Sequence, residues 1–204
     1  TIALEQNGNS PVVLPRLKIV EKVDLKNISF KGKLDVDASS GKIVLDSKNL
    51  SFNGTLGDIK IDNLKGAGKL TYEPEKGIRI DNLNVTQASG KVGDFDISSL
   101  KAKGSILFDK DYNLQLTEAS SVELDSKSGF RVKGDVSIAH NAGVYDITSK
   151  GTKPLNITYK PDGKKDTPLV SNMIIEGKVT ADTNTNTYSF NNGDAPFKIK
   201  QGSI

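Results

Sequence analysis

Apolar and polar residues alternate in short runs along most of this chain. Apolar pairs two residues apart recur throughout, and because successive side chains of a strand point to opposite faces, each pair would share one face. Between residues 20 and 140 no stretch combines i, i+3, i+4 apolar spacing with a capping residue, so the pattern predicts strands of roughly five residues and no helix. The pairs are Ile43 and Leu45, Ile59 and Ile61, Ile78 and Ile80, Leu114 and Leu116, and Val122 and Leu124.

Clusters of glycine, asparagine, proline and serine separate these runs and predict turns. Asn53-Gly54 is the cleanest hairpin signal, because Asn-Gly is favoured in the two-residue turns that join antiparallel strands. The other predicted turns are Ser39-Ser40-Gly41, Pro74-Glu75-Lys76-Gly77, Asp111-Tyr112-Asn113 and Lys127-Ser128-Gly129.

Glycines also mark an internal repeat. Gly32, Gly68 and Gly104 each stand inside the same apolar phrase and are 36 residues apart. Several independent positions that share one period indicate a repeated structural unit. The same step relates Gly57, Gly93 and Gly129, Gly54 and Gly90, and Leu64 and Leu100.

Two all-β architectures fit short strands with this period. The first is an elongated right-handed β-solenoid with parallel strands, in which two coils of roughly 18 residues make one repeat. The second is an antiparallel sheet curled into a groove, to which each repeat adds hairpins. Bends between short strands favour the solenoid. We expect a lead-in strand or fragment edge over residues 1–20, the repeat stack over 21–140, and a less regular β region with exposed polar loops over 141–204.

Composition agrees with a thin core and argues against nucleic acid as a partner. Hydrophobic residues make up 35% of the 204 residues, aromatic residues 6%, and there is no tryptophan. The 28 Lys and Arg nearly balance the 25 Asp and Glu, and the signs alternate along the chain. A net charge of +3 that is spread evenly along the chain provides no basic stripe of the kind that binds nucleic acid.

No catalytic or cofactor motif emerges from the sequence, so we expect a protein that is not an enzyme and has no cofactor or metal. Cysteine is absent, and His140 is the single histidine, expected on the surface beside a turn. Three acidic pairs with i, i+2 spacing could bind calcium or serve as a glycosidase dyad, but flanking lysines favour a solvated strand face. These pairs are Asp35/Asp37, Asp94/Asp96 and Asp109/Asp111.

Asn-x-Ser/Thr occurs five times, which allows glycosylation of a secreted protein but equally suits polar strand edges and turns. We favour the second interpretation. The five asparagines are Asn27, Asn49, Asn53, Asn84 and Asn156.

Over residues 20–140 the short repeats, the missing cysteine and phrases such as Asn49-Leu50-Ser51 resemble the β-solenoid passengers of Gram-negative exported adhesins, of the two-partner-secretion and autotransporter types. This resemblance implies an extracellular or cell-surface scaffold or adhesin segment of a bacterial exported protein. It would contact a host or neighbouring-cell surface molecule, as in virulence, and the segment to suspect is 141–172.

Another phrase resembles a different group. The run 77–85, followed by Gly90-Lys91-Val92, is similar to AsmA-like and lipopolysaccharide-transport proteins, which bridge membranes with a β-groove. That resemblance implies a periplasmic protein whose apolar interior stays accessible and binds lipid. A third possibility is a structural subunit that associates through sheet edges. No apolar run is long enough to span a membrane as a helix.

Overall fold

The computed structural model describes residues 1–92, 95–150, 153–160, 170–182, 184–185, 187–191 and 198–199. These residues form strands and connecting turns without a helix, so the all-β prediction is confirmed. Fifteen strands belong to one sheet. They are β1 (Ile2–Glu5), β2 (Val12–Val20), β3 (Val23–Asp37), β4 (Lys42–Leu56), β5 (Ile59–Glu73), β6 (Gly77–Val92), β7 (Phe95–Phe108), β8 (Leu114–Ser126), β9 (Phe130–Asn141), β10 (Val144–Ser149), β11 (Leu155–Tyr159), β12 (Val170–Glu176), β13 (Lys178–Asp182), β14 (Thr187–Asn191) and β15 (Lys198–Ile199).

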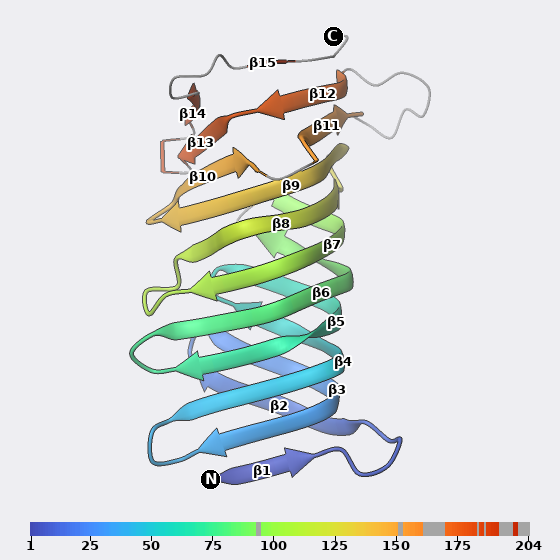
Figure 1. Ribbon diagram of the computed structural model, residues 1–204, viewed down its shortest axis with the longest axis vertical. Helices are drawn as coiled ribbons and strands as arrows, with labels where there is room; N and C mark the ends of the chain where they lie inside the picture. The colour runs from blue at the N-terminus through green and yellow to red at the C-terminus, as the bar shows by residue number, and fades with distance from the viewer. Residues whose placement is uncertain are drawn as a thin grey trace.

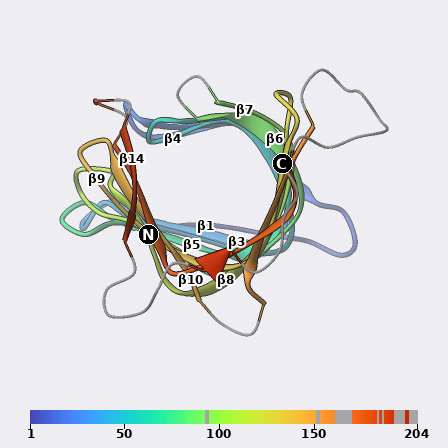
Figure 2. The ribbon, with the colours of Figure 1, turned by 90° about the horizontal axis from the view of Figure 1, so that it is seen from above.

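Strands β3 to β9 form an antiparallel meander in which each strand pairs with the next along the chain. They lie one above another along the long axis of the molecule (Figure 1). Viewed along that axis, the strands curl around it so that the sheet surrounds a central space (Figure 2). The protein is therefore an elongated, curled antiparallel sheet.

The prediction of a parallel solenoid is wrong, because every pairing between the described strands of the meander is antiparallel. The strands are also longer than expected: β3, β4 and β5 have 15 residues each and β6 has 16. The chain reverses direction at tight turns between these strands, which a stack of parallel coils cannot do. The curled groove that the sequence left as the alternative matches this arrangement.

The 36-residue period corresponds to one hairpin. Strands β3, β5 and β7 begin at Val23, Ile59 and Phe95, so each starts 36 residues after the previous one. One repeat thus contains two long strands with their turns. The sequence analysis expected two coils in each 36-residue repeat. The two halves of the repeat are instead two successive antiparallel strands.

Each long strand bends part-way along its length, and glycines occupy the bends. Gly32, Gly68 and Gly104 have nearly the same backbone angle, with φ of 154°, 154° and 150°. A Cβ atom on Gly32 would overlap the carbonyl oxygen of Asp46, which lies on the neighbouring strand. The register of β3 against β4 shifts at the same place. Only glycine combines this φ with such a close approach of two backbones.

The predicted hairpin turn at Asn53-Gly54 is likewise wrong. Both residues lie inside β4, and a Cβ atom on Gly54 would overlap the carbonyl oxygen of Asp24 on β3. Asn53 accepts a hydrogen bond at Oδ1 from the side-chain amide of Asn27, 3.1 Å away. Asn27 has a left-handed φ of 51° where the register shifts. This Asn-Gly pair therefore belongs to a bend, and the turn of that hairpin is at residues 57–58.

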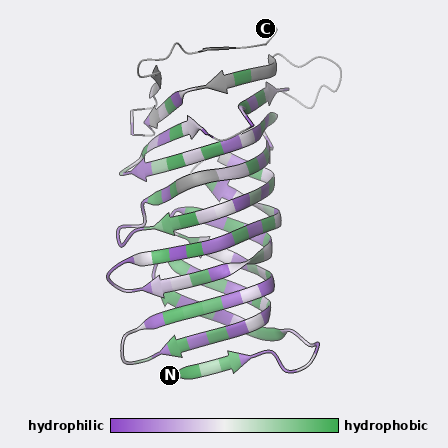
Figure 3. Ribbon diagram, viewed as in Figure 1, coloured by the Kyte–Doolittle hydropathy of each residue, from purple (hydrophilic) through white to green (hydrophobic). Residues whose placement is uncertain are grey.

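The two faces of the sheet differ in character, as the alternating colours along the strands show (Figure 3). Inward positions such as Leu25, Leu45 and Leu70 are at most 4% exposed. Outward positions carry charges of alternating sign that face one another across the strands. One such row runs over four strands through Lys33, Asp46, Lys69 and Asp81.

Two apolar clusters occupy the interior. The larger one extends from β3 to Phe108 on β7, and at its β1 end Val23, Ile28 and Phe30 are completely buried and β2 packs against them. The smaller one is built around Val136 and Leu155 on β9 and β11. At this end the sheet divides, because β9 pairs with both β10 and β11. The strands after β9 are shorter, as the less regular pattern beyond residue 140 suggested.

The bend glycines provide the first test of this fold. Replacing Gly32 or Gly54 with alanine should lower the free energy of unfolding by about 2 kcal/mol or more, because the new methyl group would meet a backbone carbonyl. Gly8 also has a left-handed φ of 64°, but a Cβ atom added there would have no other atom within 4 Å, so Gly8→Ala should cost only about 1 kcal/mol. Urea denaturation measures both. Equal effects would contradict the role of close backbone approach.

Candidate functional site: an apolar cavity inside the sheet

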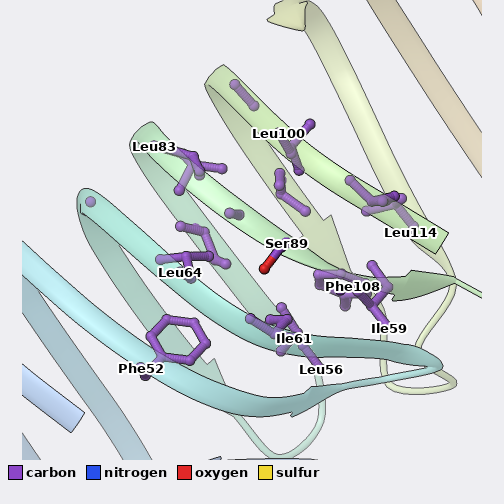
Figure 4. A pocket seen from close by; sticks show the side chains of 18 of the residues that line it. Phe52, Leu56, Ile59, Ile61, Leu64, Leu83, Ser89, Leu100, Phe108 and Leu114 are labelled. Carbon is purple, nitrogen blue, oxygen red and sulfur yellow. The ribbon is translucent and has the colours of Figure 1, made fainter. Parts of the chain in front are cut away.

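A cavity of about 280 Å³ lies within the curled sheet. Its lining comes from every strand between β3 and β9, so it follows the long axis of the molecule. Leu25 of β3 and Ile138 of β9 mark the two ends of this lining. Figure 4 labels ten of the lining residues, nearly all of them aliphatic or aromatic.

Small residues in the cross-strand rows leave this space open. One inward row runs through Leu50, Gly66, Val85, Ala102 and Val122, which are register partners on successive strands. Gly66 and Ala102 contribute little side chain. Toward the β1 end, by contrast, Phe30 is completely buried and the interior is filled. The cavity therefore results from residue size within a continuous apolar face.

A second inward row also combines large apolar residues with a small one. Phe52, Leu64, Ala88, Leu100 and Leu124 are register partners across β4 to β8, and all five line the cavity. The mixture of one small residue with large ones repeats the feature of the first row. Together the two rows give the cavity an apolar wall that crosses five strands.

Charged groups stay outside this wall. Lys60 and Lys91 border the cavity and are register partners, so they share the outer face of the sheet. The Lys60 ammonium lies 3.5 Å from the Asp62 carboxylate, and its side chain is 69% exposed. Ser89 supplies the one hydroxyl group of the lining, and Figure 4 shows its oxygen among apolar side chains. In the described part of the chain this hydroxyl has no hydrogen-bond partner, so a water or a ligand oxygen could pair with it.

Two hairpin turns of the curled sheet meet along one side of the cavity. The turn at residues 57–58, between β4 and β5, lies against the turn at 109–113, between β7 and β8. A Cβ atom on Gly57 would lie 3.6 Å from the Cβ of Tyr112 and 3.9 Å from the Phe108 ring. Lys22 places its ammonium 5.7 Å from the centre of the Tyr112 ring. We call this contact between the two turns the seam.

Cavity-lining residues flank the seam on both sides. Leu56 and Ile59 come from the strand ends next to the first turn, and Phe108 and Leu114 from those next to the second. Figure 4 shows Leu56, Ile59 and Phe108 together on one side of the cavity. Opening the seam would therefore expose the cavity directly to solvent.

His140 is buried, so the prediction of a surface histidine is wrong. It is 8% exposed, and its ring stacks on Tyr145 with the centroids 4.1 Å apart. The Gly143 amide donates to Nε2 at 3.1 Å, and the Leu114 amide approaches Nδ1 at 3.4 Å. Burial lowers the pKa of His140, and the carboxylates of Asp58 and Asp109 partly oppose this shift. The histidine joins neighbouring turns and does not line the cavity.

The described carboxylates of the acidic pairs form ion pairs and hydrogen bonds with neighbouring surface residues. Asp35 lies 3.0 Å from the Lys33 ammonium, and Asp37 accepts hydrogen bonds from Ser39 and Ser40 in the following turn, which lower the pKa of Asp37. Asp109 accepts from the backbone and side chain of Asn113, which fixes the β7–β8 turn. Burial raises the pKa of Asp109, but the hydrogen bonds together outweigh it and hold that pKa below its usual value.

The third acidic pair is described only in part. Asp96 lies 3.7 Å from the Lys127 ammonium, whereas Asp94 falls outside the described residues. Within those residues, no group of three or more acidic or histidine side chains could hold a metal ion.

Comparison of this chain with protein-family models, with curated proteins and with solved structures finds no match. Among the described residues, no helix is long and apolar enough to cross a membrane. The function is therefore argued from the cavity and its surroundings.

Sequence reasoning identified many of the inward residues as strand pairs, but it left open whether the apolar interior is closed or accessible. Ile59, Ile61 and Ile80 were recognised from their alternation, and all three line the cavity. Ala88 and Ala102 were not singled out, because small residues give no strong signal in an alternating pattern. Their positions in the rows become meaningful only once the register is known.

The buried histidine generates a pH prediction. His140 titrates at an ordinary value of 6.5 when the chain is unfolded and lower when it is folded. Because the unfolded state then binds more protons, stability is fully present above about pH 6.5 and falls as the pH drops through the lowered pKa. Chemical denaturation between pH 7.5 and 5 should show this loss. His140→Gln should flatten the curve over that window, and an unchanged slope would contradict the assignment.

Proposed function

We propose that this protein binds the apolar chain of a lipid inside the curled sheet, as a lipid-binding or lipid-bridging β-groove protein. The observation that carries the proposal is the cavity, whose wall crosses seven strands and includes no charged side chain facing inward. A long, apolar, uncharged space suits an alkyl chain and disfavours a polar ligand, because burying an unpaired charge or polar group is costly.

The cost of leaving the interior unfilled supports the same proposal. Apolar cavities destabilise a folded protein in proportion to their volume, on the order of several kcal/mol for a space of this size. Larger residues at Ala88 or Ala102 would reduce that cost. The chain instead carries small residues in the middle of the meander, at Ala88 and Ala102, which both line the cavity. A ligand that fills the space would recover the missing contacts.

We also propose that the protein is located in the periplasm of a bacterial envelope, because its sequence resembles those of membrane-bridging β-groove proteins. The adhesin hypothesis stays a prediction. Its suspected contact segment, 141–172, includes residues 151–152 and 161–169, which lie outside the described part of the chain. We favour lipid binding because it gives a role to the apolar cavity, which a simple scaffold does not need.

A pair of neighbouring residues offers a matched test. Ala102 lines the cavity, whereas Lys103 is exposed on the outer face of the same strand. Ala102→Phe should fill part of the cavity and weaken the binding of a fluorescent fatty acid at least tenfold, about 1.4 kcal/mol. Lys103→Phe adds the same ring outside and should leave the affinity unchanged. Fluorescence titration in detergent-free buffer measures both variants.

Two results would count against the proposal. The first is an unsubstituted protein that shows no saturable binding of the fatty acid. The second is an equal loss of affinity in both phenylalanine variants. Circular dichroism and the midpoint of thermal unfolding establish that each variant is folded before its affinity is compared.

A further inference from the structure

Apolar side chains pack at both ends of the cavity lining. Val23, Ile28 and Phe30 fill the interior toward β1, and strand β2 packs against them. At the opposite end the cluster around Val136 and Leu155 includes Ile138, which also marks the limit of the cavity lining. A ligand that entered along the axis would have to displace one of these clusters.

Backbone hydrogen bonds join the strands of the wall between these ends, whereas the seam is a contact between two turns. Successive strands from β3 to β9 are joined by antiparallel ladders. Among the described residues, no hydrogen bond or ion pair links the turn at 57–58 with the turn at 109–113. They meet through the contact of Gly57 with Tyr112 and through Lys22 over the Tyr112 ring. Parting the seam therefore breaks no ladder.

Tyr112 itself is held in an unusual conformation. Its φ is 65°, in the left-handed region that is costly for a bulky residue, and burial raises the pKa of its hydroxyl. Asp109 fixes this turn through its bonds to Asp111 and Asn113. The turn thus presents the tyrosine to Gly57, where an added Cβ atom would make an ordinary van der Waals contact with the tyrosine.

The dimensions of the cavity restrict the ligand. Seven strands at a spacing of about 4.8 Å give the lining a length of roughly 29 Å. A volume of about 280 Å³ drawn out over that length is narrow, at the lower limit of ordinary ligand pockets. It has room for one extended alkyl chain and not for two side by side.

We propose that the seam is a lateral entrance through which a lipid with a single alkyl chain, such as a fatty acid or a lysolipid, inserts that chain while its head group remains in water. This inference rests on the proposed function and adds the route and the ligand class. The head group stays outside because the interior offers one hydroxyl, that of Ser89, and no charged partner.

An engineered disulfide tests the entrance directly. The chain has no cysteine, and the 3.6 Å between the Cβ positions of residues 57 and 112 suits a disulfide. A variant with Gly57→Cys and Tyr112→Cys should bind cis-parinaric acid when reduced, and oxidation should slow association at least tenfold. A matched control joins β4 and β5 away from the seam, through Val44→Cys and Thr71→Cys, which are register partners. Oxidising this control should change nothing.

Two further measurements complete the test. Oxidising the seam variant after it has been loaded should trap the probe and slow its release, and Tyr112→Ala should accelerate association. Native mass spectrometry with palmitic acid should show one molecule per chain, with no transfer of a two-chain phospholipid from phosphatidylcholine vesicles.

The outcomes separate the two proposals. Equal association rates for the reduced and oxidised seam variant would overturn the lateral entrance but leave lipid binding intact. Binding of two palmitic acid molecules, or of intact phosphatidylcholine, would overturn the single-chain assignment. A wild-type protein that binds no probe would overturn the proposed function itself.

Discussion

The close approach of neighbouring backbones at the bend glycines is the constraint on which this structure depends. Strands of about 15 residues would form a broad, open sheet if they ran straight. At Gly32 and Gly54 the chain lies so near the adjacent strand that a methyl group cannot fit. Gly90, 36 residues after Gly54, approaches the carbonyl oxygen of Lys60 in the same way, and Gly68 and Gly104 repeat the φ of Gly32. The bends therefore recur with the 36-residue period of the curled sheet.

Curling brings together parts of the chain that are distant in sequence. It places the turn of the β4–β5 hairpin against the turn of the β7–β8 hairpin, and it directs the apolar residues of seven strands toward one axis. The outer face then carries the alternating charges that keep a thin, elongated protein in water. The size of the inward residues decides where the axis is filled, as at Phe30, and where it remains open, as beside Ala102.

Much of this fold could be predicted from the sequence, but the direction of the strands could not. Period-two alternation revealed which residues share a face, and the glycine spacing revealed the 36-residue unit. The bend glycines, however, interrupt the alternation inside each strand, so one long strand was interpreted as several short ones. A bend and a turn use the same residues, and Asn53-Gly54 was therefore taken for a hairpin although β4 continues through it.

The cavity and the seam could not be predicted from the pattern of apolar and polar residues, because that pattern does not contain the register of the strands. Whether an apolar interior is closed or open follows from which side chains meet across strands, and therefore from the register. The burial of His140 follows similarly from the packing of the ends of β8 and β9, where Leu114 and His140 meet although they lie 26 residues apart in sequence. The central claim, that the interior holds an alkyl chain, is tested most directly by native mass spectrometry of protein purified without detergent, combined with solvent extraction. Our account predicts a co-purifying lipid at near-stoichiometric amount; a bare protein mass that stays unchanged after incubation with palmitic acid would contradict it.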